Sequence, residues 1–118
     1  MLMIFSNNPV VSDKYPKLTR LADSDVHGVF AAVRDAVHKG ARLVSHPLSG
    51  SVKPNESPYK SVAVDIVTGE WALDFKSLQI IEDAITTLAK LPRKHREYTA
   101  QMLEDFRVID LDLIESAL

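Results

Sequence analysis

The sequence lacks cysteine and has almost no net charge, and each absence removes a class of function. With no cysteine among 118 residues, the chain has no disulfide, no thiolate nucleophile and no thiolate metal site. A formal net charge of −2 gives no field that would attract nucleic acid or an anionic membrane. No apolar run approaches the ~20 residues that a membrane span needs, and the N-terminal MLMIF has no basic flank of a signal peptide. We therefore expect a cytoplasmic protein without a cofactor.

The composition that remains is typical of one globular domain. The chain is 46% hydrophobic and 25% charged, which argues against disorder. A length of 118 residues suits a single domain with its own core. We therefore treat residues 1–118 as one domain.

Hydrophobic periodicity predicts strands and helices in alternation. Strands are expected at residues 1–5, 18–22, 42–45 and 61–67, the last buried on both faces, with a short edge strand at Trp71 and Leu73. Helices are expected at residues 9–15, 24–39 and 74–90, followed by a helical tail over residues 92–118 that is divided into 93–105 and 110–118.

The helix boundaries follow from capping residues. Asn8, Ser24 and Asp74 are residue types that cap helix N-termini, and Gly40 is suited to end the second helix. Strands that alternate with helices favour a mainly parallel sheet. The sequence therefore predicts a three-layer, Rossmann-like or flavodoxin-like α/β fold, with a small, mainly parallel sheet, flanking helices and a helical C-terminal tail.

One segment, HPLSGSVKPNESPYKS at residues 46–61, is unusually polar and constrained. It contains three prolines, one glycine, four serines and two lysines. In parallel sheets, ligands bind beyond the carboxyl ends of the strands. We expect this loop and Ser6-Asn7-Asn8, which follows the first strand, to meet at that edge.

Three stretches give the chain a resemblance to a known family. They are SNNPVV, VHKGARLVSHPLSGSVKPNESPYKSV and DFKSLQIIEDAI. Together they resemble the GrdX-like family, small proteins encoded beside glycine reductase and related amino-acid reductases, over about residues 3–90. The resemblance implies a setting in amino-acid fermentation and carries over no catalytic residue.

The polar loop offers the groups of an anion site. Hydroxyl and backbone N–H groups and positive charges suit a carboxylate or phosphate; they come from Ser49, Gly50, Ser51, Lys53 and Lys60, with Asn55 in the turn between Pro54 and Pro58. The alternative is a proline-stiffened connection whose serines satisfy their own turns. No G-x-x-x-x-G-K-[ST] phosphate loop is present.

Histidine and asparagine side chains supply the other candidates. His46 follows a predicted strand and could act as an acid or base, or bond a backbone group. Asn7 could contact a ligand, whereas Asn8 is better explained by capping. His27 and His38 are about 16 Å apart along one helix and cannot share a metal ion, so we expect no metal site.

The tail has an apolar stripe that must be covered. The stripe comprises Tyr98, Met102, Phe106, Ile109 and Leu113. It could pack on its own domain or form a homodimer through residues 92–118.

Three functions are therefore open. The first is a non-catalytic accessory protein that binds a small anionic metabolite. The second is a small hydrolase or isomerase that uses His46. The third is an assembly factor that contacts reductase subunits through the tail.

Overall fold

The computed structural model describes residues 1–49, 55–67, 69, 71–92 and 97–118. Its strands are β1 (Leu2–Ser6), β2 (Thr19–Leu21), β3 (Arg42–Leu43) and β4 (Ser61–Asp65). Its helices are α1 (Pro9–Lys14), α2 (Val26–His38), α3 (Phe75–Lys90) and α4 (Ala100–Ala117). The α/β class is confirmed, but the described residues 71–74 form no edge strand.

The sheet is mixed and mostly antiparallel, so the prediction of a mainly parallel sheet is wrong. Its strand order is β2-β1-β4-β3. Among the paired strands only β1 and β2 are parallel, whereas β4 pairs antiparallel with both β1 and β3. The physical reason is the connection between β3 and β4: its described residues, 44–49 and 55–60, contain no crossover helix, and β4 returns in the direction opposite to β3. This arrangement does not confirm a flavodoxin-like fold.

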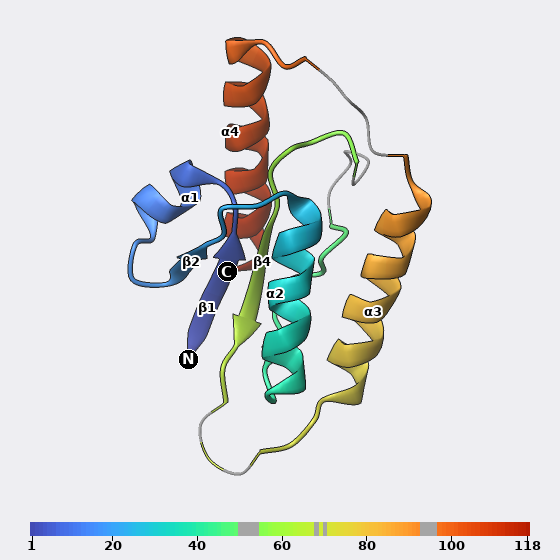
Figure 1. The fold of residues 1–118 in the computed structure, drawn as a ribbon. Coiled ribbons are helices and arrows are strands. Elements are labelled where there is room, and N and C mark those ends of the chain that lie inside the picture. Colours follow the sequence, from blue (N-terminus) through green and yellow to red (C-terminus); the bar gives the residue numbers. More distant parts are fainter. Residues whose placement is uncertain (50–54, 68, 70, 93–96) are drawn as a thin grey trace.

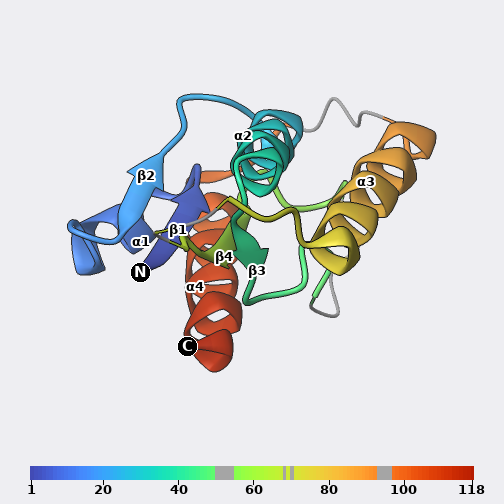
Figure 2. The same ribbon diagram turned by 90° about the horizontal axis from the view of Figure 1, so that it is seen from below.

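Helices pack on both faces of the sheet (Figure 2). On one face, α2 covers Val62, Val64 and Phe5, and α3 packs against α2 through Ile81, Ala84 and Leu88. On the other face, Ile4 and Ala63 contact Val11 of α1 and Ile114 of α4. As the sequence predicted, β4 is buried on both faces, since Val62, Ala63 and Val64 are each 0% exposed.

The predicted caps are confirmed at two of three helices. Asn8 caps α1 through Val10 N, and Asp74 caps α3 through Ser77 N. At α2 the cap is Asp25 rather than Ser24, because the Asp25 carboxylate accepts the hydrogen bond from Gly28 N. Gly40 follows α2 with φ +101°, where a Cβ would lie 3.3 Å from Ala72 O, so glycine ends this helix as expected.

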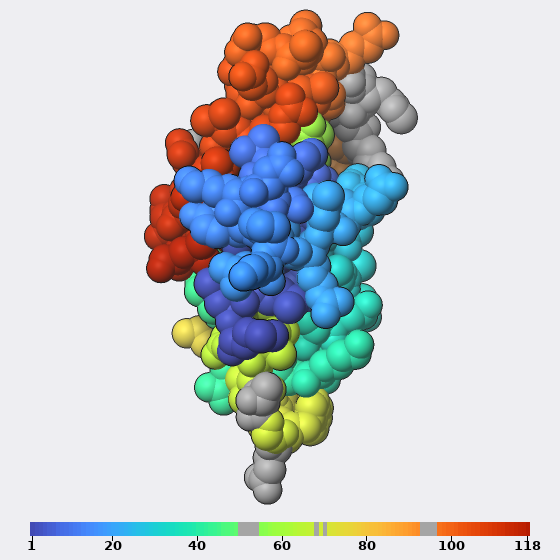
Figure 3. Space-filling view, turned by 90° about the vertical axis from the view of Figure 1, so that its left-hand side faces the viewer, coloured from blue at the N-terminus to red at the C-terminus, as the bar shows by residue number. Residues whose placement is uncertain are grey.

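The tail is one helix rather than two, and α4 begins at Ala100. The sequence predicted a separate helix over residues 110–118, but these residues continue α4, and within them Asp110 is 5% exposed and Ile114 is 2% exposed against the sheet. Figure 1 shows α4 extending past β1 and β4, and Figure 3 shows α1 and α4 together on one side of the molecule. Residues 93–96 of the predicted helix lie outside the described residues.

Candidate functional site

A closed network of buried polar groups joins the sheet to α4. Ser6 and Ser61 are paired across β1 and β4 and their hydroxyl oxygens are 2.7 Å apart. Ser61 Oγ donates to Asp110 Oδ2 at 2.7 Å, and Asn8 Nδ2 donates to the same oxygen at 3.1 Å. The Ser61 hydroxyl has a single hydrogen, which it donates to Asp110, so in the Ser6–Ser61 pair Ser6 is the donor. Ser6 Oγ in turn accepts from Asn8 N at 2.9 Å.

The electrostatics of this network centre on Asp110. Burial raises the pKa of the Asp110 carboxyl, while hydrogen bonds from Ser61 and Asn8 and the charge of Lys60 oppose the rise. Burial also lowers the pKa of Lys60, and the nearby Asp110 opposes that change. Ser6 and Asn8 are 0% exposed, so the network presents no open face to a ligand. Its evident role is to fix α4 on the sheet.

Asn7 points to the other side of the sheet and connects three segments. Its Nδ2 donates to Ser24 O at 3.0 Å and to Pro58 O at 2.8 Å. Its Oδ1 accepts from Lys60 N at 2.8 Å. Lys60 Nζ in turn donates to Ser49 O at 3.0 Å. The strand end and the polar loop therefore meet at one edge, as the sequence predicted.

A cleft of about 490 Å³ opens beside Asn7. Its lining comes from the turn into α2 (residues 24–27), the second half of the polar loop (Asn55 and residues 57–59), the end of α3 (Leu88, Leu91 and Pro92) and Tyr98 before α4. A volume of this size is typical of a small-molecule site. It is the candidate site.

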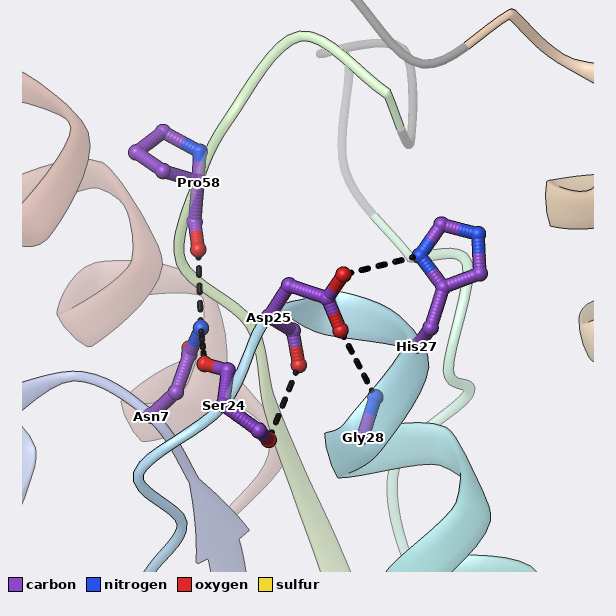
Figure 4. Close-up of polar contacts among 6 residues, drawn as sticks. All are labelled: Asn7, Ser24, Asp25, His27, Gly28 and Pro58. Atoms are coloured by element: carbon purple, nitrogen blue, oxygen red, sulfur yellow. Dashed lines mark hydrogen bonds and ion pairs between the residues drawn. The ribbon is translucent and has the colours of Figure 1, made fainter.

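The start of α2 contributes three polar residues to the cleft lining, Ser24, Asp25 and His27 (Figure 4). Asp25 accepts from Gly28 N and lies 3.5 Å from His27 Nδ1. Ser24 Oγ donates to Asp25 O. A Cβ on Gly28 would lie 2.1 Å from Ser24 Oγ, so only glycine lets Ser24 pack against this turn.

Two tyrosines in the lining are held by contacts at their hydroxyl groups. Tyr98 donates to Glu56 O at 3.0 Å and packs edge to face on Phe106, with ring centroids 5.9 Å apart. Tyr59 accepts from Arg107 Nη1 at 3.1 Å, and the Arg107 guanidinium lies 5.6 Å from the Tyr59 ring centroid. The α4 segment therefore positions both aromatic side chains.

The predicted ligand-binding residues divide between three places. Asn7 and Asn55 line the cleft. Asn8 is enclosed in the buried network, while Ser49 and Lys60 contact one another outside the described lining. Gly50, Ser51 and Lys53 lie outside the described residues.

His46 lies apart from the cleft as well. It is exposed, and its Nδ1 accepts from Leu48 N at 3.0 Å. That bond is the backbone contact that the sequence offered as the alternative to an acid–base role. Among the described residues, no three His, Asp or Glu side chains are grouped to hold a metal ion.

Several residues that matter for the cleft and the network were not identified from the sequence. His27 was considered only as a metal ligand, and Asp110 only as the first residue of a helix over residues 110–118. Tyr59 and Tyr98 lie near the candidate residues in the chain, but only tertiary packing brings them to one cleft. The prolines near Tyr59 indicated only that this loop has a constrained backbone.

The fold is a mixed α/β domain, and its cleft is lined by both polar and apolar residues, which do not by themselves define an activity. A family model described as GrdX-like protein matches residues 3–118. The chain therefore belongs to the GrdX-like family, and the match extends the expected resemblance through α4. No curated protein and no solved structure matches the chain significantly. Within the described chain, no helix is long and apolar enough to cross a membrane.

Proposed function

We propose that this protein is a non-catalytic accessory protein of amino-acid reductase metabolism that binds a small molecule in the cleft beside Asn7. The observation that carries the proposal is the cleft itself, about 490 Å³ in volume and lined by five separate segments of the described chain. Membership of the GrdX-like family supports the metabolic setting.

The position of the polar groups favours binding over catalysis. Asn7 uses its amide to hold backbone groups of Ser24, Pro58 and Lys60. His46, the residue on which a hydrolase or isomerase would depend, is outside the described lining. The groups that binding needs are therefore already held at the cleft, whereas the one proposed acid–base residue is not in its described lining.

Ligand-induced stabilisation tests this proposal. Amino acids, acyl phosphates and related metabolites are added to the full chain and the melting temperature is recorded. A ligand at 100 times its Kd stabilises a folded protein by about 2.7 kcal/mol, which corresponds to roughly 5–15 °C in a domain of this size. Isothermal calorimetry then gives the affinity of each ligand that raises the melting temperature.

Two histidines on α2 provide a matched pair of variants. His27 lines the cleft, whereas His38 is at the far end of the same helix. Each is partly exposed and lies within 4 Å of a carboxylate, Asp25 or Glu82. His27→Ala should weaken binding and His38→Ala should leave it unchanged. Equal affinities in the two variants, or no ligand at all, would contradict the proposal.

A second candidate function, assembly with another protein, is favoured by the outer side of α4. Val108 and Ile109 are 50% and 40% exposed there. Neighbouring exposed aliphatic side chains are suited to a protein contact, either with a reductase subunit or with a second copy of this chain.

A further inference from the structure

We propose that the ligand of the cleft carries an aromatic ring and that this ring, rather than an anionic group, provides most of the binding energy. The inference rests on the proposed function, because it assigns a chemical class to the ligand of the same cleft. It departs from the anionic metabolite expected from the polar loop.

The first argument is the state of the polar side chains in the described lining, most of which already have partners within the protein. Both Asn7 donor hydrogens bond backbone carbonyls. Ser57 Oγ donates to Tyr59 O and accepts from Tyr59 N. The Asn55 amide nitrogen donates to Pro92 O, and its Oδ1 has no partner but is shielded from solvent. A ligand gains little by replacing these bonds, because each exchange leaves a protein group unpaired.

The second argument is the composition of the remaining lining. Val26, Leu88, Leu91, Pro58 and Pro92 present apolar surface, and Tyr59 and Tyr98 add two aromatic rings. Aromatic ligands bury large area against such groups and favour offset or edge-to-face contact with other rings. An aliphatic anion would bury far less area there.

The third argument is that the aromatic residues are held in place before any ligand binds. Phe106 and Glu56 fix Tyr98, and Arg107 fixes Tyr59. Side chains that are already ordered lose little conformational entropy on binding. The polar lining residues Ser24, Asp25 and His27 lie close to one another (Figure 4) and suit a single hydrogen-bonding head group.

Matched small probes test the inference on the full chain. Benzoate and acetate share a carboxylate and differ in the ring, as benzyl alcohol and ethanol share a hydroxyl; inorganic phosphate serves as an anion without a ring. Backbone amide shifts are followed by ¹H–¹⁵N NMR. Each aromatic probe should shift the amides of His27, Tyr59 and Leu91, and should bind at least about tenfold tighter than its partner without a ring.

A variant of the apolar wall gives the control. Leu91→Ser should weaken binding of both aromatic probes roughly fivefold to tenfold. Val108→Ser, which changes an exposed aliphatic side chain on the outer side of α4, should leave their affinity unchanged. Equal losses in the two variants would overturn the inference.

The outcomes distinguish the aromatic class of the ligand from the proposed function, which is the binding of a small molecule in the cleft. Acetate or phosphate binding at the same amides as tightly as benzoate would overturn the aromatic class and leave the binding function standing. A metabolite without a ring that binds in the cleft and depends on His27 would do the same. Failure of every probe and every metabolite would overturn both.

Discussion

Asn7 and Asn8 are neighbours of the same residue type at the end of β1, yet they belong to two different regions. Asn8 enters the buried network with Ser6, Ser61 and Asp110, where it is 0% exposed. Asn7 lies on the opposite side, against the cleft. Successive side chains along an extended chain point to opposite faces, so one residue step separates a structural asparagine from one at a candidate site.

The comparison shows that polarity alone does not identify a binding site. The buried network and the cleft edge are both rich in amide and hydroxyl groups. In the network the amide and hydroxyl groups bond one another and no space is left beside them. At the cleft edge, open volume and apolar surface lie next to the polar groups. Open volume, not the number of polar side chains, distinguishes the two regions.

The largest expected effect comes from the two asparagines. Asn8→Ala removes the α1 cap and leaves Asp110 with one donor fewer, so the free energy of unfolding should fall by about 3 kcal/mol. Asn7→Ala removes three partly exposed hydrogen bonds and should cost about 1–2 kcal/mol. Urea denaturation of both variants measures the difference. A larger loss for Asn7→Ala would reverse the roles assigned to the two regions.

The next effect is a pH dependence that belongs to the network. Asp110 has a pKa near 3.9 in the unfolded chain and a raised pKa in the folded chain. The folded state therefore binds more protons between these values, and the free energy of unfolding falls as the pH rises through that range. Asp110→Asn removes this titration, so its stability relative to the native protein should improve as the pH rises above about 4.

Denaturation curves at several pH values measure this difference. Ser116→Ala, an exposed change on the same helix, should keep the pH dependence of the native protein. A difference between Asp110→Asn and the native protein that stays constant with pH would mean that Asp110 does not titrate as described.

A smaller effect links the two regions through α4. Arg107→Met removes the hydrogen bond to the Tyr59 hydroxyl and the cation that faces its ring. We expect a stability loss of about 1 kcal/mol and a severalfold loss of cleft affinity, measured by calorimetry. Glu104→Gln, exposed on the same helix, is the control. Unchanged ligand affinity in Arg107→Met would show that α4 does not position the cleft wall.

The smallest effect on stability is expected on the outer side of α4. Val108→Ser with Ile109→Ser should change the free energy of unfolding by less than about 0.5 kcal/mol, because both side chains are already exposed. Size-exclusion chromatography and co-purification with reductase subunits show whether either contact depends on this surface. Unaltered behaviour in both measurements would remove the outer side of α4 as a protein contact.

The sequence predicted most elements because hydrophobic periodicity is a local signal. The apolar residues that recur with helical spacing in α2 are all buried, namely Val26, Val29, Phe30, Val33 and Val37, and β4 is buried as predicted. Strand direction was not predictable in the same way: a strand buried on both faces is typical of parallel sheets, yet the helices on both sides of this sheet bury the antiparallel β4 just as fully. The direction depends on pairing with β1 and β3, which is a tertiary property.

The candidate site could be predicted only in part, for a related reason. Asn7 and the second half of the polar loop are at the cleft because strand ends and loops meet at sheet edges. His27, Leu91 and Tyr98 come from elements whose packing the sequence did not specify. Asp110 was missed because a carboxylate on a helix is usually solvated, and only its partners Asn8 and Ser61 allow it to be buried.

A crystal structure with the ligand that most raises the melting temperature tests the central claim most directly. The account predicts electron density in the cleft, in contact with Tyr59, Tyr98 and the first turn of α2, with the Ser6–Ser61–Asp110 network unchanged. Ligand density beside Ser49 and His46 instead, with the cleft empty, would contradict it.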